Sequence, residues 1–96
     1  MIDRAVAISD NGAMKLLIEA QALKALMKMP RADAMALRDK LKAFAADPNG
    51  THPWAKAFGG GMGRIRHGDW RAVYRLDGET VTVVVLKIGN RREVYR

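Results

Sequence analysis

Apolar residues recur at steps of three and four between residues 32 and 46, which is the spacing of one face of an α-helix. They are Ala34, Leu37, Leu41, Phe44 and Ala45. A second helix is predicted at about residues 21–29, because Pro30 cannot donate a backbone hydrogen bond and disfavours helical geometry at the residue before it. The two segments together predict a helical hairpin with one apolar face.

The last third of the chain alternates between apolar and polar residues, as strands with one buried face do. Three strands are predicted at about residues 63–67, 70–76 and 80–88, with turns at Gly68-Asp69 and Asp77-Gly78. They form an antiparallel meander whose last strand is apolar on both faces through its middle, as an inner strand is. Two helices cover one face of such a sheet, so we expect the other face to stay partly open.

Two parts of the chain are less clearly patterned. Residues 51–63 have no period and contain four Gly, which predicts a mobile surface loop. A phosphate-cradling loop is the alternative, but no Gly-Lys-Ser/Thr end and no following helix are present. Near the N-terminus, residues 16–18 fit either a short strand or the start of one long helix, and residues 5–8 fit an extra strand, a hairpin partner or an extension.

A chain of 96 residues forms one domain, because it can close only a single hydrophobic core. It contains no Cys and two isolated His residues, so it offers no disulfide, thiol nucleophile, thiolate metal site or all-histidine metal site. No apolar run reaches the ~18 residues of a membrane span, and the N-terminus lacks the order of a signal peptide. These features predict a soluble cytoplasmic protein without a metal or cofactor.

The formal net charge is +7, and the excess lies mainly in the second half. Residues 1–50 carry 8 Lys and Arg against 6 Asp and Glu, whereas residues 51–96 carry 9 against 4. Such a basic field attracts nucleic acid, an anionic membrane or an acidic protein, and charge alone does not choose among them. Most of these cations are Arg, which binds phosphate in a bidentate manner, so nucleic acid is favoured over membrane.

The strand pattern gathers guanidinium groups. Residues two apart share a strand face, so Arg64 and Arg66 project together, as do Arg71 and Arg75 on the neighbouring strand. Fixed positive charge of this kind stabilises the charge that develops when a phosphodiester is attacked. The alternative interpretation is that these are ordinary solvated strand residues.

The segment after the last strand can bring Arg91 and Tyr95 to the same patch. Tyrosine is a poor base because its side chain ordinarily has a pKa of about 10, and several adjacent cations are needed to favour its phenolate. Arginine keeps its proton, so it is better suited to clamping phosphate and stabilising charge than to donating protons.

Aromatic residues fall into two pairs. Trp70 and Tyr74 share one strand face and are expected in the core rather than in base stacking. Trp54 and Phe58 lie in the predicted loop and are expected to contact a partner. His67 is a rival catalytic group, but a solvated turn histidine is the commoner explanation beside Gly68.

Three stretches of sequence occur together: Ala22-Leu23-Lys24-Ala25-Leu26 with Lys28-Met29-Pro30, Arg64-Ile65-Arg66-x-Gly68-Asp69-Trp70-Arg71-x-Val73-Tyr74, and Ile88-Gly89-x-Arg91-Arg92-Glu93-Val94-Tyr95. In these stretches the chain resembles the RelE/ParE superfamily of toxins from type II toxin-antitoxin modules, and specifically its RelE-type mRNA interferase branch. The resemblance covers about residues 14–96, and its last two stretches together are specific.

The resemblance implies an α+β fold in which two N-terminal helices pack on a mainly antiparallel four-stranded sheet, in the order β-α-α-β-β-β. It favours a strand near residues 15–20 over one long helix. Residues 14–96 then form a single toxin domain, and residues 1–13 are an N-terminal extension of uncertain structure or the product of an upstream start codon.

In the RelE-type branch the toxin enters the ribosomal A site and cleaves messenger RNA there, with the ribose 2′-hydroxyl attacking the adjacent phosphate and no metal required. The resemblance implies Tyr95 as the general base, and Arg71 and Arg91 as clamps of the phosphate and leaving oxygen. Arg64 and Arg66 match the family's basic pair in character, with Arg in place of Lys, and are implied to position the substrate. Which of the two fills which role is left open.

Two other functions stay open for the same fold: a ParE-like toxin that poisons DNA gyrase without being an enzyme, and an inactive module that only binds its antitoxin. The ParE branch typically lacks the Arg and Tyr set that this chain retains. A toxin of this type implies a cognate antitoxin in a hetero-oligomer, and an acidic, partly disordered antitoxin segment would complement the basic field.

Overall fold

The computed structural model describes residues 6–9 and 14–94 of the chain. In chain order its elements are β1 (Val6–Ser9), β2 (Lys15–Ile18), α1 (Ala20–Lys28), α2 (Arg31–Ala46), β3 (Ala55–Gly59), β4 (Met62–His67), β5 (Trp70–Asp77), β6 (Thr82–Asn90) and α3 (Arg91–Val94).

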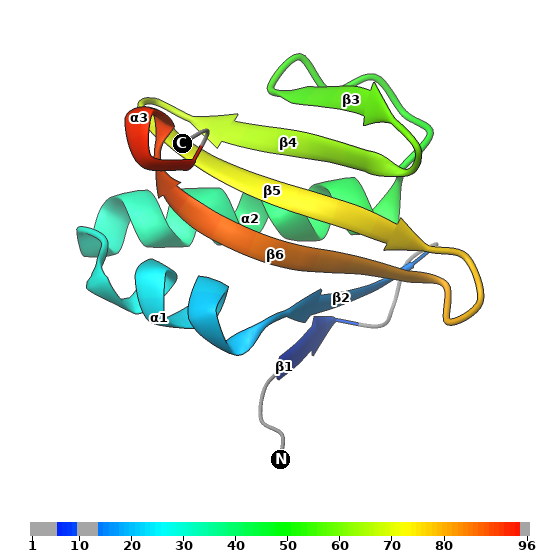
Figure 1. Cartoon of the computed structure of the whole chain (residues 1–96), viewed down its shortest axis with the longest axis horizontal. Helices are drawn as coiled ribbons and strands as arrows, with labels where there is room; N and C mark the ends of the chain where they lie inside the picture. The colour runs from blue at the N-terminus through cyan, green and yellow to red at the C-terminus, as the bar shows by residue number, and fades with distance from the viewer. Residues whose placement is uncertain (1–5, 10–13, 95–96) are drawn as a thin grey trace.

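One sheet of six strands, in the order β1-β2-β6-β5-β4-β3, forms the centre of the fold. Strand β2 runs parallel to β6, and the other neighbouring strands are antiparallel. Helices α1 and α2 lie together on one face of the sheet, and α3 follows the end of β6 (Figure 1). The predicted α+β class, the helical hairpin and the β4-β5-β6 meander are therefore confirmed.

The predicted count of four strands is too low, and the loop predicted for residues 51–63 is wrong over β3. Strand β3 pairs antiparallel with β4 along one edge of the sheet. Four of its five residues are exposed, so no alternation of apolar and polar residues marks it in the sequence. Its Gly residues form the turn into β4, where Gly59, Gly60 and Gly61 have φ of 97°, 64° and 80°.

At the other edge, β2 settles the choice left open near residues 16–18 in favour of a strand. It pairs with the first four residues of β6, which supply its backbone hydrogen-bond partners. Strand β1 pairs with the free side of β2, so the segment that contains Val6 adds an outer strand to the sheet.

The core lies between the helices and the covered face of the sheet. Leu16, Ile18, Leu37, Leu41, Ile65, Val83 and Val85 are the largest side chains that are fully buried there. Tyr74 is also buried, and its ring lies 4.8 Å from that of Phe44 between centroids. This burial raises the pKa of the Tyr74 phenol. Tyr74 is thus a core residue, as predicted.

Val81, which precedes β6, has a backbone conformation that suits glycine. Its φ is 53°, although branching at Cβ makes this region unfavourable for valine. The carbonyl of Val81 accepts a hydrogen bond of 2.9 Å from the Lys15 N–H, which ties the strained residue to β2. Its side chain is 48% exposed, so little packing offsets the strain.

We expect the substitution Val81→Gly to raise the free energy of unfolding by about 1 kcal/mol, because it relieves the left-handed strain. Denaturant unfolding measures the change. Glu79→Gly, at an exposed turn residue with negative φ, is the matched control and is expected to lower stability or leave it unchanged. A loss of stability in Val81→Gly equal to that in the control would contradict the strain.

Candidate functional site

The open face of the sheet, opposite the helices, carries a group of cations that strand register brings together. Residues paired across a ladder share a face, and β4 pairs with β5 so that Arg66 lies opposite Arg71. Two residues further along β4, the next row on this face runs across four strands. In it Lys56 pairs with Arg64, Arg64 with Val73, and Val73 with Lys87. We call the six residues Lys56, Arg64, Arg66, Arg71, Arg75 and Lys87 the basic face.

Sequence analysis identified the four Arg of this face but not its two Lys. Lys56 lies on β3, which has no periodic signal, so its face could not be assigned. Lys87 follows a register shift between β5 and β6, where Val73 pairs with Lys87 but Tyr74 pairs with Val85. Because the extra residue in β6 changes which side chains share a face, simple alternation gives no reliable answer there.

The β4–β5 turn fixes one end of the basic face. The Arg71 Nη1 donates to the carbonyls of Gly68 at 2.7 Å and Trp70 at 3.0 Å, which orients its guanidinium along the turn. The backbone N–H of Arg91 donates to the carbonyl of Asp69 in the same turn, at 2.7 Å. Arg66, Arg71 and the start of α3 therefore meet at one end of the sheet.

Arg64 lies one row further from this turn. Within the described residues, its Nη1 is the buried side-chain nitrogen or oxygen that has no hydrogen-bond partner. An unpaired buried charged group is costly, and an anionic oxygen is the partner that a guanidinium nitrogen accepts best. Because this nitrogen is buried, the Arg64 side chain must move outward before the nitrogen can bind a phosphate.

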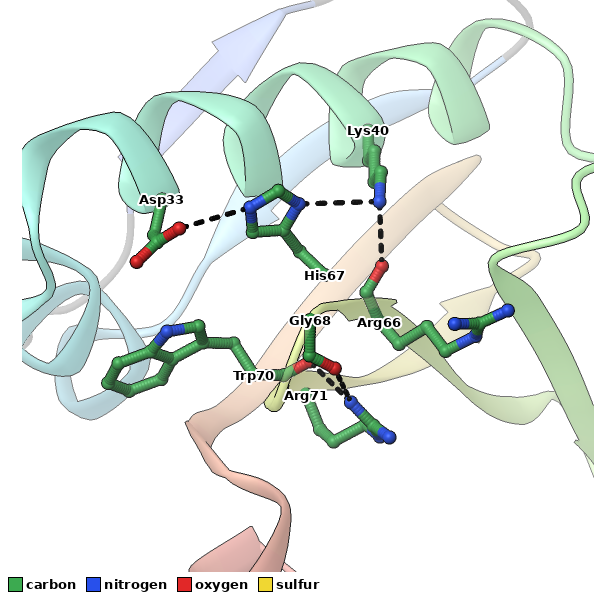
Figure 2. Close-up of polar contacts among 7 residues, drawn as sticks. All are labelled: Asp33, Lys40, Arg66, His67, Gly68, Trp70 and Arg71. Atoms are coloured by element: carbon green, nitrogen blue, oxygen red, sulfur yellow. Dashed lines mark hydrogen bonds and ion pairs between the residues drawn. The ribbon is translucent and has the colours of Figure 1, made fainter.

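On the covered face, a chain of polar contacts ties the same turn to α2 (Figure 2). The His67 Nε2 lies 3.2 Å from the Asp33 Oδ1, and the His67 Nδ1 lies 3.4 Å from the Lys40 Nζ. The Lys40 ammonium also donates to the Arg66 carbonyl at 3.1 Å. An ammonium only donates, so the His67 Nδ1 accepts and its Nε2–H donates to Asp33.

Both nitrogens of His67 are therefore occupied by partners from the helical layer, away from the basic face. This arrangement gives His67 a structural role, and its ring is held against α2 rather than solvated in the turn. Burial lowers the pKa of the Lys40 ammonium, and the nearby Arg66 guanidinium lowers it further. The charge of Arg66 on the open face therefore also acts on Lys40, on the other side of the sheet.

We expect Lys40→Met to lower the free energy of unfolding by about 1–3 kcal/mol, because it leaves the Arg66 carbonyl and the His67 Nδ1 without their donor. Chemical denaturation measures the loss. Lys42→Met, on the same helix, is the control and makes none of these contacts. Equal losses in the two variants would show that the contacts of Lys40 contribute nothing.

Trp54 lies in the turn that precedes β3, and its side chain is half-buried. It packs against the core, its carbonyl accepts a 2.9 Å hydrogen bond from the Arg66 N–H, and the Lys40 Nζ lies 5.9 Å from its ring centroid. Trp70 is half-buried against the core, as expected. Phe58 on β3 is 51% exposed and keeps a surface that a partner can contact.

Arg91 and its neighbours border a shallow hollow of about 300 Å³, lined by Asp69, Asn90, Arg91 and Arg92. Sequence analysis did not single out Asp69 or Asn90, because their proximity depends on the pairing of Trp70 with Asn90. Tyr95 lies outside the described residues, so its role as general base remains a prediction.

The described residues contain neither a cluster of metal ligands nor a membrane-spanning helix. No three His, Asp or Glu side chains in residues 6–9 and 14–94 come together as metal ligands. Nor is any helix in this part of the chain long and apolar enough to cross a membrane.

Comparison with known proteins identifies the family. The family model described as "ParE toxin of type II toxin-antitoxin system, parDE" matches residues 16–95. The chain belongs to this family. It is a toxin of a type II toxin-antitoxin system within the RelE/ParE superfamily, as the sequence resemblance predicted. No protein of curated function matches the chain significantly.

Solved structures resemble this toxin over most of its length. The isolated RelE toxin of E. coli has 28% sequence identity and a TM-score of 0.67, covering 83% of this chain and 88% of that one. The toxin-antitoxin complex RelBE2 of Mycobacterium tuberculosis gives 25% identity and a TM-score of 0.64, covering 79% and 95%. The RelE-RelB complex of Pyrococcus horikoshii, at 23% identity and a TM-score of 0.62, covers 77% and 90% and supports the fold alone.

Proposed function

We propose that this toxin is a ribosome-dependent mRNA endonuclease that inhibits translation by cutting the message in the ribosomal A site. The observation that carries the proposal is the pairing of Arg66 with Arg71 beside the turn that binds the Arg91 N–H. In this proposal the guanidinium groups of these three residues, from β4, β5 and α3, bind one phosphodiester group. Likeness to the RelE toxin of E. coli supports this branch of the superfamily.

In the proposed reaction, the Tyr95 phenolate removes the proton of the ribose 2′-hydroxyl, and the 2′-oxygen bonds to the adjacent phosphorus. The bond from phosphorus to the 5′-oxygen breaks, and this oxygen takes a proton from solvent. The products are a 2′,3′-cyclic phosphate and a 5′-hydroxyl end. Arg71 and Arg91 bind the phosphate and the leaving oxygen, because their fixed charge stabilises the added negative charge.

Arg66 positions the RNA at this centre, and Arg64 positions it one row further from the β4–β5 turn. They lie two residues apart on β4, about 7 Å along the strand. Once its side chain turns outward, Arg64 binds the phosphate next to the one that is cut, which gives its buried, unpaired Nη1 a partner. The tied guanidinium of Arg71 needs little reordering when substrate binds, because two carbonyls already hold it.

The cognate antitoxin is the second proposed partner, in a hetero-oligomer in the cytoplasm. Similar toxins have been solved as complexes with antitoxins. A groove of about 570 Å³ between α1 and α2 offers an apolar docking surface, and Met27 and Met35 in its lining are 77% and 54% exposed. Arg31 and Arg38 also line it, which suits an acidic antitoxin segment.

A second candidate function is poisoning of DNA gyrase without catalysis. It is favoured by the family match itself, because the matching family model is that of ParE toxins. The two functions differ in what happens to the message: an interferase cuts it at positions set by codons, whereas a gyrase poison leaves it intact and causes DNA damage.

We expect Tyr95→Phe and Arg91→Ala each to lower message cleavage in an in vitro translation reaction by at least about 100-fold, because each removes a group assigned to the transition state. Codon-positioned cuts are mapped by primer extension. Arg31→Ala, on the helical side, is the control with the same loss of charge.

Thermal unfolding distinguishes loss of chemistry from loss of fold in these variants, and their midpoints are expected to match that of the parent toxin. Full cleavage by Tyr95→Phe and Arg91→Ala would rule out the assigned roles. An intact message together with gyrase-dependent DNA breaks would favour the ParE-like function instead.

We expect Lys56→Gln and Lys87→Gln each to reduce the salt dependence of RNA binding, because each Lys is placed to neutralise one phosphate. For a single strand, the slope of log affinity against log salt should change by about 0.7 per variant. Fluorescence anisotropy with an uncleavable 2′-O-methyl oligonucleotide measures it. Lys24→Gln on α1 is the control, and an equal slope change there would mean that RNA does not follow the basic face.

A further inference from the structure

The groove between α1 and α2, which lie on one face of the sheet in Figure 1, has two thioether side chains at its surface. Met27 of α1 is 77% exposed, and Met35 of α2 is 54% exposed. In the part of the chain that the structure describes, the other large apolar side chains that are exposed are Phe58 and Val81. The exposed large apolar side chains of the two helices therefore both line this groove.

Helical spacing brings the groove residues together. Met27 lies four residues after Leu23 on α1. On α2, Met35 lies four residues after Arg31 and three before Arg38. These spacings put each set on one helix face, and all five residues line the groove. Lysine or glutamate forms a helix as readily as methionine and suits an exposed position better, so the fold does not require Met here. A flexible thioether suits contact with a partner, because it adapts to irregular apolar surfaces.

Oxidation of sulfur in this chain is confined to thioethers, because the chain contains six Met and no Cys. Hydrogen peroxide oxidises a thioether to a sulfoxide by transfer of one oxygen atom. A lone pair of the sulfur attacks one peroxide oxygen, the O–O bond breaks, and the leaving hydroxide takes the proton of the transferred oxygen to become water. Sulfur thereby loses two electrons to the peroxide. Methionine sulfoxide reductases reverse this reaction.

Burial of the thioethers sets the order in which peroxide reaches them. Met29 lines the same groove but is only 6% exposed, and Met14 and Met62 are half-buried. Among the described residues, Met27 and Met35 are the exposed thioethers, so they are expected to be oxidised first. Neither belongs to the core, so a sulfoxide at these positions changes the groove without disturbing the fold.

We propose that Met27 and Met35 form a reversible oxidation site for hydrogen peroxide, and that their oxidation weakens docking of the acidic antitoxin segment in this groove; this inference rests on the antitoxin partner of the proposed function. Arg31 and Arg38 line the groove with one carboxylate, that of Asp39, so its net charge favours an acidic segment. A second copy of this chain, with a net charge of +7, is repelled. Each sulfoxide oxygen is an acceptor that an apolar segment leaves without a donor, which weakens binding.

The exposure of the two thioethers gives the effect a direction. A docked segment covers both of them and shields them from peroxide, so oxidation acts on the free toxin. An oxidised free toxin is neutralised less well until its sulfoxides are reduced. Peroxide therefore prolongs the activity of toxin that is already free, rather than releasing toxin from its complex.

The test begins with the full chain treated with hydrogen peroxide, and mass spectrometry of its peptides measures the oxidation of each Met. Met27 and Met35 should be oxidised at least about tenfold faster than Met29. The thermal unfolding midpoint should stay that of the untreated toxin. Binding to the groove is probed with the fluorescent dye anilinonaphthalene sulfonate, which joins apolar rings to one negative charge. Its affinity should fall about tenfold after oxidation.

Three variants assign the effect to the two thioethers. The double variant Met27→Leu with Met35→Leu keeps an apolar groove of similar volume without sulfur, so peroxide should not change its affinity for the dye. The double variant Met27→Gln with Met35→Gln places polar groups there without oxidation and should bind the dye about tenfold more weakly than the parent toxin. Met62→Leu removes a thioether of β4, away from the groove, and should lose dye binding on oxidation as the parent does.

Oxidation of Met29 as fast as that of Met27, an unchanged dye affinity after oxidation, or an equal loss in the Leu variant would overturn the proposal. Toxin dimers that peroxide dissociates would assign the groove to a second copy and overturn the antitoxin as its occupant. Dye binding that falls on oxidation in a toxin that leaves the message uncut would contradict the proposed RNA-cleaving function alone. Message cleavage with a dye affinity that oxidation does not change would contradict the oxidation site alone.

Discussion

The antiparallel pairing of β4 with β5 is the constraint on which the rest of the structure depends. Its register places Arg66 opposite Arg71 on the open face and directs Ile65 and Ala72 into the core on the other. A slip of one residue would exchange these two sets and bury the guanidinium groups. Burial of the core residues therefore also fixes the positions of the Arg residues on the open face. No additional element is needed to bring Arg66 and Arg71 together.

This pairing has an electrostatic cost, because like charges directly opposite each other on a sheet repel. Contacts on both sides of the β4–β5 turn hold the two strands in this register despite that cost. On the open face, the carbonyls of Gly68 and Trp70 hold the Arg71 guanidinium. On the covered face, Lys40 and His67 join the turn to α2. A bound anion would relieve the remaining repulsion, as expected for a site whose charges serve a ligand rather than stability.

The sequence predicted the elements in which apolar residues recur with a clear helical or strand period. It did not predict the element that depends on backbone pairing with a neighbouring strand. The apolar residues of α2 recur with the period of a helix, and those of β4 and β5 alternate as in a strand, so these elements were predicted. Strand β3 exists because its backbone pairs with β4, and its exposed side chains give no signal. The four Arg of the open face followed from alternation, whereas Lys56, Asp69 and Asn90 join the site only through cross-strand register. Family resemblance supplied the roles proposed for Arg91 and Tyr95, which no spacing rule could give.

The chemistry of the cut ends tests the proposed RNA-cleaving role of the basic face most directly. Message recovered from a translation reaction with the toxin can be analysed for its terminal groups. Attack by the 2′-hydroxyl predicts 5′-hydroxyl ends and 2′,3′-cyclic phosphates, because the bond to the 5′-oxygen is the one that breaks. Ends bearing a 5′-phosphate and a free 3′-hydroxyl would contradict that mechanism, and a message left uncut would contradict the function itself.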